Sequence, residues 1–503
     1  MSSQPACIYW NLYYLLLILL ILCGCQKAQP QVSVEPPLPQ DPWVQAYFNH
    51  SRSAQYTDPY RGVTRNGDNL EQVIVDAIAS AKSTVDVAVQ ELRMPRIAQA
   101  LVERKQAGVK VRVILDNNYS LPVSKLTAES VAKLPQRERS RYNESLILID
   151  RDGDGQLSAT EISEGDALII LGNGGVPMID DTADGSRGSG LMHHKFIVID
   201  NKASIITSAN FTLSDLHGDF QFRESRGNPN NLLKIESVEL AKQFTQEFNV
   251  MWGDGAGGKP DSKFGLKKPW RAVKQVTLGD TTGGDTTGGD TTVGDTTVGD
   301  TTIAIKFSPT STTKPWHQSS NGVIAQILPQ AKETINIALF VFSEQRLTNV
   351  LEESHQQGVK VKALIEPSFA FRYYSEGLDM MGVAVAHKCK YETGNRPWRQ
   401  PIATVGVPQL PEGDVLHHKF AILDGNTVIT GSHNWSKAAN TRNDETVLVI
   451  HSPIVAAHFE REFQRLYGKA VKGVPVRVQQ KIKAQQQKCV PLDPYSSVEH
   501  TIE

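Results

Sequence analysis

Two short stretches of the chain carry a histidine and a lysine two residues apart, His193 with Lys195 and His417 with Lys419. On a strand, residues two apart point to the same face, so each pair presents an imidazole beside an ammonium. A neutral imidazole is a nucleophile and a base near pH 7, and the ammonium binds an anion without competing for the imidazole proton. The pairs therefore predict nucleophilic chemistry on a phosphate.

Polar residues follow each pair at matching distances and suit the same chemistry. Serine hydroxyls and asparagine amides on a second strand can donate hydrogen bonds to phosphoryl oxygens. A glutamate farther along can accept a hydrogen bond from a histidine Nδ1 and so fix its tautomer. The expected supporting residues are Ser208, Asn210 and Glu224 after the first pair, and Ser432, Asn434 and Glu445 after the second.

These residues belong to a chain that repeats itself. Residues 191–200 reappear at 416–424 with an offset of 224 (417 − 193), and residues 106–115 reappear at 356–365 with an offset of 250 (358 − 108). Repetition on this scale predicts two homologous lobes of about 200 residues each. The change of offset, 250 − 224 = 26, predicts about 26 extra residues in the first lobe.

Each lobe has the pattern of an α/β fold. Apolar residues at helical spacing run from Leu70 to Ala81, and alternating valines follow at 85–89. Such alternation of helices and strands favours a mixed sheet flanked by helices. The expected segments are a signal peptide at 1–24, a Pro-rich tether at 25–43, lobe 1 at 44–254, a linker with Gly-Asp-Thr-Thr repeats at 255–302, lobe 2 at 303–468 and a basic tail at 469–503.

The paired motifs resemble the signature of the phospholipase D superfamily, His-x-Lys-x4-Asp followed by Gly-Ser-x-Asn. The first copy ends at Asp200 and has Thr207 where the family has Gly, and the second copy ends at Asp424 and keeps the glycine. The resemblance covers about residues 44–468. It implies that the two lobes share one active site at their interface, so a monomer is sufficient.

The resemblance also implies a two-step reaction. One histidine attacks phosphorus and forms a phosphohistidine, while the other protonates the leaving alcohol and then activates water. The family needs no cofactor for this step, and the nonbridging oxygens would be held by Lys195, Lys419, Asn210 and Asn434. Which histidine attacks stays open, and the family slightly favours His193. Asp200 and Asp424 belong to the catalytic motif, but their odd spacing from the histidines predicts that they face away and support the motif.

A different motif accounts for the extra residues of lobe 1, at about 140–170. Residues 150–161 match the twelve-residue EF-hand calcium loop, including the glycine at its sixth position. We expect Ca²⁺ to bind there and stiffen the insertion, and the alternative is an acidic surface turn. The expected ligands are Asp150, Asp152, Asp154, the carbonyl of Gln156, Ser158 and Glu161.

The first 24 residues carry no charged side chain, and residues 12–25 are almost wholly apolar. Fourteen helical residues reach roughly 21 Å, which suits a signal peptide better than a ~30 Å hydrocarbon core. The tetrapeptide 22–25 resembles a bacterial lipobox, which implies cleavage before Cys25 and a lipid on that cysteine. An uncleaved signal anchor is the alternative. Both interpretations predict a membrane-anchored protein outside the cytoplasm, in the bacterial periplasm or at the cell surface.

The charge balance bears on the substrate. Against 54 Asp and Glu the chain has 52 Lys and Arg, a net charge of −2 over 503 residues, so it lacks the basic excess of DNA-binding surfaces. With the membrane anchor, this favours a phospholipid, cleaved to phosphatidic acid and a free headgroup alcohol. A surface or secreted nuclease of the same superfamily is the alternative, with nucleic acid the less favoured partner. The third hypothesis is a non-catalytic lipoprotein that binds calcium and phosphate.

Two features near the C-terminus leave alternatives open. Cys389 and Cys489 are the only cysteines after Cys25, and an oxidising compartment would allow them to pair, although their spacing does not establish it. The basic tail at 469–503 is expected to be a solvated tail, with contact to anionic lipid headgroups as the second interpretation.

Overall fold

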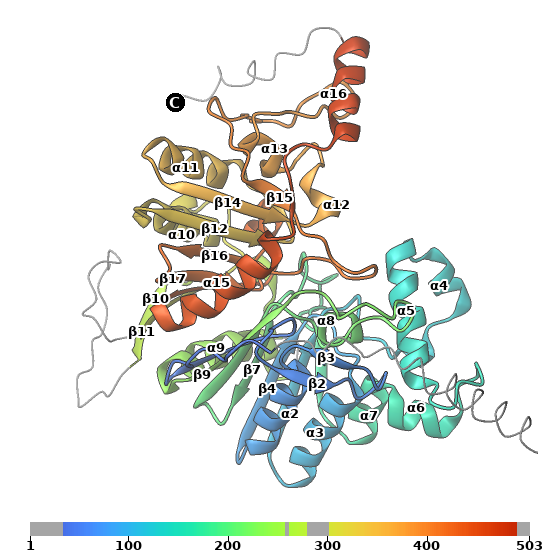
Figure 1. Ribbon diagram of the computed structural model, residues 1–503. Coiled ribbons are helices and arrows are strands. Elements are labelled where there is room, and N and C mark those ends of the chain that lie inside the picture. The colour runs from blue at the N-terminus through green and yellow to red at the C-terminus, as the bar shows by residue number, and fades with distance from the viewer. Residues whose placement is uncertain (1–33, 257–260, 279–300, 490–503) are drawn as a thin grey trace, which may run out of the picture.

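The computed structural model describes residues 34–256, 261–278 and 301–489. Within them the chain forms two lobes, each built on one large sheet with helices packed against it, lobe 1 below and lobe 2 above in Figure 1. The expected signal peptide, the lipidation site Cys25 and nearly all of the Gly-Asp-Thr-Thr repeats lie outside the described residues. Among the described residues, no helix combines the length and the apolar character needed to cross a membrane.

The sheet of lobe 1 has seven strands and is mixed. β4 pairs in parallel with β5 and antiparallel with β7, the strand that begins at Lys195. The spatial order is β1 (Val44–Phe48), β9 (Asn231–Glu236), β8 (Ala203–Thr207), β7 (Lys195–Ile199), β4 (Thr84–Val89), β5 (Lys110–Leu115) and β6 (Met178–Asp180).

The sheet of lobe 2 repeats this order and adds one strand at each edge. β12 pairs in parallel with β14 and antiparallel with β16, the strand that begins at Lys419. The order is β10 (Lys274–Leu278), β11 (Thr301–Phe307), β19 (Thr446–His451), β17 (Thr427–Gly431), β16 (Lys419–Leu423), β12 (Thr334–Leu339), β14 (Lys360–Ile365), β15 (Val405–Val407) and β20 (Val471–Lys472). The repeated order confirms two homologous α/β lobes.

Amphipathic helices pack against the sheets. In lobe 1, α2 (Leu70–Ser80) buries Leu70, Ile74 and Ile78, and its N-terminus is capped by the side chain of Asn69. This is the helix that the apolar spacing predicts. Further helices of this kind are α3 (Pro95–Gln106) and α9 (Val238–Trp252) in lobe 1, and α10 (Ser320–Ile327), α11 (Gln345–Gln356) and α15 (Pro453–Tyr467) in lobe 2.

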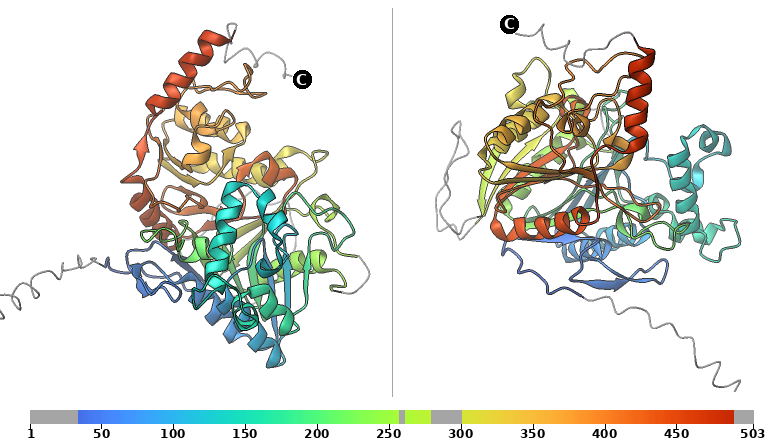
Figure 2. Two further views of the ribbon diagram at one scale, coloured as in Figure 1. Left: turned by 90° about the vertical axis from the view of Figure 1, so that its right-hand side faces the viewer. Right: turned by 45° about the horizontal axis from the view of Figure 1, so that its top comes forward.

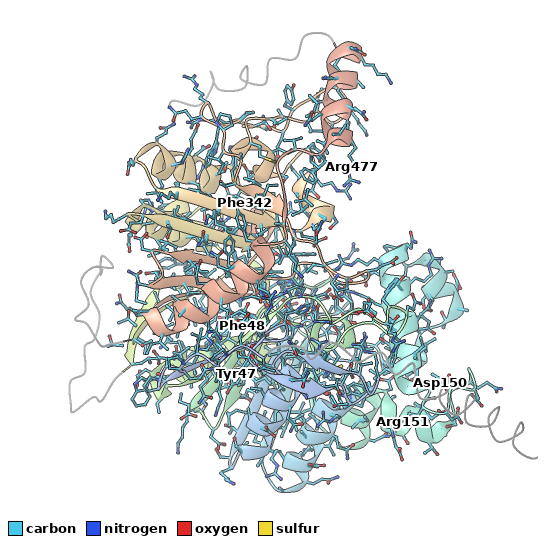
Figure 3. All side chains as sticks on the ribbon, in the orientation of Figure 1. Tyr47, Phe48, Asp150, Arg151, Phe342 and Arg477 are labelled. Atoms are coloured by element: carbon cyan, nitrogen blue, oxygen red, sulfur yellow. A yellow bond between two sulfur atoms is a disulfide. The ribbon has the colours of Figure 1, made fainter. Side chains whose placement is uncertain are left out.

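The lobes meet in an apolar core to which both contribute. α9 supplies Phe244 and Phe248, and α15 supplies Phe459 and Phe463, all fully buried in one cluster. Phe48 of lobe 1 lies between the lobes (Figure 3), and its ring centroid is 5.0 Å from that of Phe459. The lobes are therefore packed together by a shared hydrophobic core rather than by a polar contact alone.

The extra residues of lobe 1 form a helical insertion between β5 and β6. This connection runs from 116 to 177, whereas its counterpart between β14 and β15 runs only from 366 to 404. The insertion begins earlier than the expected residue 140 and stands out at the right-hand edge of Figure 1 and of the right-hand view in Figure 2. Its helices are α4 (Ala128–Lys133), α5 (Gln136–Ile149), α6 (Ala159–Gly165) and α7 (Ala167–Asn173).

Two expected boundaries differ from the structure. The expected tether includes Asp41, which is buried and accepts hydrogen bonds from Thr301 and Ser452. The expected linker at 255–302 contains β10, which pairs with β11. Neither feature is predictable from apolar periodicity, because a single buried carboxylate and a short polar strand give little periodic signal.

The basic tail also belongs to the fold. β20 pairs with β15, and α16 (Val476–Lys488) packs on lobe 2 through the buried Val478. Arg477 at the start of α16 is labelled in Figure 3. A disulfide joins Cys389 to Cys489, directly after α16, so residues 469–489 form part of lobe 2 rather than a solvated tail.

Candidate active site

The two motif histidines lie where the lobes meet, and each is held by a residue of the other lobe. His193 Nδ1 lies 2.7 Å from Glu445 Oε2 of lobe 2. His417 Nδ1 lies 3.0 Å from Asn230 Oδ1 of lobe 1. Each histidine comes two residues before a central strand, β7 or β16. The reciprocal contacts bring the two motifs into one site.

The motif lysines are the first residues of β7 and β16, and both are almost completely buried. Their Nζ atoms donate to the carbonyls of the histidines two residues earlier, at 3.0 Å for Lys195 and 2.6 Å for Lys419. Burial lowers the pKa of Lys195 to about 8. Burial, reinforced by the charge of Lys195, lowers the pKa of Lys419 well below its usual range. An anion bound beside these two lysines would favour their charged forms and oppose the lowering of their pKa values.

The two histidines differ in their electrostatic surroundings. Burial lowers the pKa of His193, while the charge of Glu445 acts in the opposite direction. Burial also lowers the pKa of His417 well below 6.5, and the charges of Lys419 and Lys195 lower it further. Despite its burial, Glu445 has a pKa of about 2 because of His193, so it is ionised. His193 thus has a carboxylate partner, whereas His417 has a neutral amide.

Glu224, the expected partner of a histidine, is not in the site. It is exposed and lines a surface cavity with His50 and Arg226. Asn230 takes its place, and the repeat contained the signal: Phe244 matches Phe459 at an offset of 215, and the same offset leads from Glu445 to Asn230. Residue type alone predicts a glutamate in both lobes, whereas the local offset of 215 indicates Asn230.

The supporting serines hold the loops after β8 and β17. Ser208 Oγ donates to Asn230 Oδ1 at 2.7 Å, and Ser432 Oγ accepts from the backbone N–H of Thr446 at 3.0 Å. The Ser208 hydroxyl is therefore engaged within the protein, which contradicts its expected hydrogen bond to a phosphoryl oxygen. The same role for Ser432 stays a prediction. The side-chain amides of Asn210 and Asn434 make no hydrogen bond to another described residue, which leaves their donors available.

Asp200 and Asp424 directly follow the strands β7 and β16. Asp200 accepts hydrogen bonds from the backbone N–H groups of Lys82, Ser83 and Thr84, and these lower its pKa to about 2 despite its partial burial. Asp424 accepts the equivalent three N–H groups, at 332–334. Neither carboxylate bonds to a motif histidine, and both have the orientation that their odd spacing predicts.

The second histidine of each motif is structural. His194 is fully buried and contacts Thr446 and Glu247. His418 is equally buried, and its Nε2 lies 3.0 Å from Glu462. Both rings pack beneath the strands, and the contacts of their ring nitrogens stabilise the interface between the lobes.

Three further residues near His417 had no signal in the motifs. Phe340, directly after β12, has its ring centroid 5.1 Å from that of His417. Asp215 is buried, with Oδ2 3.8 Å from His417 Nδ1, and accepts a hydrogen bond from the Asn210 N–H. Arg137 of α5 has its Cζ 5.6 Å from the Phe340 ring centroid. These residues come from segments that only the tertiary fold brings together.

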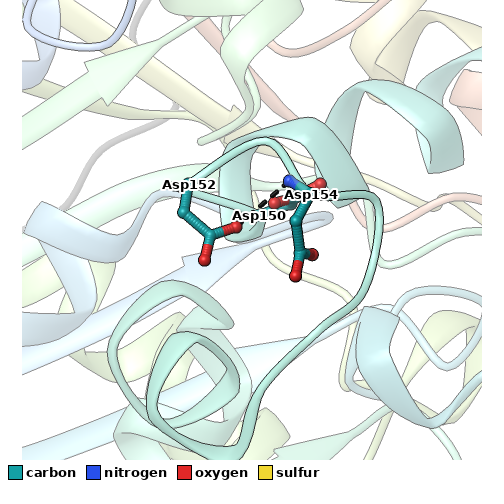
Figure 4. Close-up of side chains that lie close together, drawn as sticks. All are labelled: Asp150, Asp152 and Asp154. Atoms are coloured by element: carbon teal, nitrogen blue, oxygen red, sulfur yellow. Dashed lines mark hydrogen bonds between the residues drawn. The ribbon is translucent and has the colours of Figure 1, made fainter.

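The calcium-type loop connects α5 to α6 at the outer end of the insertion, where Figure 3 labels Asp150 and Arg151. Carboxylate oxygens of Asp150, Asp152 and Asp154 all lie within 4.8 Å of one another (Figure 4). Asp150 accepts the N–H groups of Gly153 and Gly155, which have positive φ as the loop requires. These three residues thus form an oxygen-rich group that suits Ca²⁺.

One expected ligand, Glu161, does not join this group. It accepts from the N–H of Arg151 and from Ser158, forming a capping box at the start of α6. Ser158 Oγ donates to the same carboxylate, and the N–H of the exposed Gln156 donates to Asp154. Ser158 Oγ and the Gln156 carbonyl stay predicted ligands.

Comparison with known proteins identifies the family. The family described as "Cardiolipin synthase, PLD-like domain" matches residues 74–252 and 324–467, one match in each lobe. The chain belongs to this family. Its two matches coincide with the two lobes, so this is a phospholipase D superfamily protein with the expected α/β fold.

Curated relatives of this family member match over one lobe's length. A mitochondrial cardiolipin hydrolase of Chlamydomonas reinhardtii is 30% identical over 140 residues, 28% of this chain and 54% of the relative. A phospholipase D of Rickettsia typhi is 29% identical over 136 residues, 27% of this chain and 57% of the relative. The alignments thus span only about half of each relative. A solved phosphatidylserine synthase of Haemophilus influenzae Rd KW20 aligns over 90% of this chain and 96% of its own with 13% identity and a TM-score of 0.49.

Proposed function

We propose that this family member is a phospholipase D that hydrolyses a phospholipid to phosphatidic acid and the free headgroup alcohol. The observation that carries the proposal is that each motif histidine is hydrogen-bonded to a residue of the other lobe. His193 is bonded to Glu445, and His417 is bonded to Asn230. The names of the relatives, a cardiolipin hydrolase and a phospholipase D, support a phospholipid substrate. The net charge of −2 also supports lipid over nucleic acid.

In the first step, His193 Nε2 attacks phosphorus, and the bond from phosphorus to the headgroup oxygen breaks. A positive charge develops on the phosphorylated imidazole, and Glu445, 2.7 Å from Nδ1, stabilises it. His417 donates a proton to the leaving oxygen. An imidazolium without a carboxylate partner is the stronger acid, so the amide of Asn230 suits the donor role.

In the second step, His417, now neutral, takes a proton from water while the water oxygen attacks phosphorus. The phosphorus–nitrogen bond breaks, and phosphatidic acid leaves with His193 neutral and His417 protonated again. An alcohol in place of water would give transphosphatidylation. Throughout, Lys195 and Lys419 neutralise charge on the nonbridging oxygens, and the free amides of Asn210 and Asn434 donate to them.

The test uses a chain that starts at Gln26, assayed on phosphatidylcholine vesicles and on DNA. We expect lipid cleavage, reduced at least ~10³-fold by His193→Ala and by His417→Ala. His317→Ala is the control because His317 is exposed and remote from both motifs. Cleavage of DNA without cleavage of lipid would establish the nuclease alternative. Phosphate binding without any cleavage would instead favour the non-catalytic lipoprotein.

The loop at 150–161 is proposed to bind Ca²⁺ through the carboxylates of Asp150, Asp152 and Asp154, outside the reaction itself. Titration calorimetry of the wild-type chain should show one bound Ca²⁺, and Asp150→Asn with Asp154→Asn should abolish it. Glu129→Gln on the exposed face of α4 removes one charge from the same insertion and should leave binding unchanged. No heat from the wild-type chain would contradict the site.

The chain is further proposed to be anchored outside the cytoplasm through a lipid on Cys25. The Cys389–Cys489 disulfide supports an oxidising compartment. Mass spectrometry of the mature protein should show loss of residues 1–24 and the added lipid. A mature chain that keeps this segment would instead indicate an uncleaved signal anchor.

A further inference from the structure

An arginine of the insertion reaches the site and has no partner there. Arg137 lies in the first turn of α5, and its Cζ is 5.6 Å from the ring centroid of Phe340 in lobe 2. The same ring lies 5.1 Å from that of His417, and Lys419 Nζ lies 5.2 Å from its centroid. Arg137 makes no hydrogen bond or ion pair with any other described residue. A guanidinium without an ion-pair partner therefore lies next to Phe340, whose ring contacts the histidine assigned to the leaving group.

A cavity of about 170 Å³ lies next to this guanidinium. Asn228, one of its lining residues, is two residues from Asn230, the partner of His417. The cavity is therefore on the His417 side of the site. Its walls come from α5, from the loop after α8 (Leu213–Leu216) and from lobe 2, and include Arg137, Ser140, Arg141, Asp219, Asn228 and Gly413.

The other charged groups around this cavity are already engaged. Glu144 accepts the N–H groups of Phe220 and Gln221, and Asp219 accepts from Ser214. Arg141 lies 3.9 Å from Glu91 and 4.0 Å from Glu138.

Three acids beyond this cavity act on Arg137 only through space. They are Asp215, Glu366 and Glu138, and none forms an ion pair with it. Asp215 accepts from Asn210 and Asn228, and Glu366 accepts from the N–H of Leu416. Arg137 is thus the cation around this cavity that remains free to bind a ligand.

We propose that this cavity is the headgroup pocket and that Arg137 binds an anionic group, a carboxylate or a phosphate, carried by the leaving headgroup. The inference rests on the proposed function, in which His417 protonates the headgroup oxygen. A guanidinium pairs with such groups through two parallel hydrogen bonds. The preference therefore acts on the headgroup, whose oxygen His417 protonates in the proposed reaction.

The experiment compares two lipids that differ in a single carboxylate, phosphatidylserine and phosphatidylethanolamine, each diluted in neutral detergent micelles. Arg137→Gln should lower kcat/KM for phosphatidylserine about tenfold or more and leave phosphatidylethanolamine within about twofold. Phosphatidylglycerophosphate against phosphatidylglycerol gives the same comparison for a phosphate. A selective loss in either pair supports the pocket and identifies its anion. Equal losses on both members of each pair, or no loss, would overturn it.

The matched control is Arg139→Gln, which removes the same charge from the same helix. Both arginines are exposed, but Arg139 does not line the cavity. The control substitution should leave the ratio of kcat/KM values within each lipid pair unchanged. A similar selective loss for Arg139→Gln would mean that Arg137 acts by general electrostatic attraction rather than in the pocket. A binding measurement separates this inference from the proposed function. In the His193→Ala chain, O-phosphoserine should bind more tightly than O-phosphoethanolamine, and Arg137→Gln should remove the difference. Equal binding before that substitution contradicts the pocket, whereas failure to cleave any lipid contradicts only the proposed function.

Discussion

Glu445 and Asn230 occupy equivalent positions in the two lobes, yet they give their histidines different chemistry. A carboxylate beside Nδ1 stabilises an imidazolium, whereas an amide accepts the same hydrogen bond without the charge. His417 consequently has the lower tendency to hold a proton, since burial and two lysines act on it without a compensating carboxylate at hydrogen-bond distance. In the proposed reaction, this difference between the two side chains suits His193 to the role of nucleophile and His417 to the role of proton donor.

The first prediction concerns pH. Burial lowers the pKa of both histidines, so we expect a bell-shaped profile of kcat/KM with an optimum on the acidic side of 6.5. A carboxylate near an imidazolium favours the protonated form and raises its pKa. Asn230→Asp should therefore raise the pKa of His417 and move the limb of the profile that His417 controls to higher pH.

Asn230→Ala provides the matched comparison because it removes the hydrogen bond without adding charge. It should lower kcat without an alkaline shift of that limb. An unchanged profile for Asn230→Asp would show that His417 is not the proton donor.

Much of this site is predictable at the residue scale because the chemistry forces the pattern. Histidine and lysine two apart, followed by serine and asparagine, identified the residues that the structure gathers. The partner of His417 was missed because an amide does not look catalytic, and Arg137 was missed because its helix has no counterpart in lobe 2. The role of Ser208 was wrong because a hydroxyl that fixes a loop and one that binds substrate look identical in sequence.

At the scale of elements, α16 shows how a segment of weak pattern becomes part of the fold. Its sequence is basic and mostly exposed, with Val478 as its buried contact. The Cys389–Cys489 disulfide and the hydrogen bonds between Gln485 and Ala386 attach it to lobe 2. Apolar periodicity could not predict this docking, since a crosslink replaces the missing hydrophobic face.

The second prediction follows from that crosslink, which joins residues 100 positions apart. Cys489→Ser should lower the free energy of unfolding by about 2–4 kcal/mol, since the unfolded chain regains freedom. Urea titration measures the change, and kcat should stay the same because α16 contributes no residue to the histidine site. Cys389→Ser and the double substitution should each give the same loss. Additive losses would mean that the cysteines act separately.

At the scale of the whole molecule, the lobes depend on each other for both stability and chemistry. The shared core places Phe48, Phe244 and Phe459 in one cluster. The histidine of each lobe is held by a residue of the other. The duplication could be predicted from the offsets alone, but this exchange of partners could not, because sequence repeats do not show which lobe supplies a contact.

The third prediction tests that dependence. A protease site placed within residues 281–300 should allow the chain to be cut between β10 and β11 without loss of activity. The two pieces should elute together, because the apolar core holds them. Each lobe expressed alone should be inactive, since its histidine lacks the partner. Activity from one lobe as a monomer would contradict a shared site.

The pairing of β7 and β16 motifs in one polypeptide has a consequence for how such a site evolves. Two identical subunits related by a twofold axis must present identical partners to both histidines, so a change that helps one role also alters the other. Fusion of the two halves removes that constraint. Selection can then keep a carboxylate beside the histidine that becomes phosphorylated and place an amide beside the histidine that donates the proton. In this chain these residues are Glu445 and Asn230.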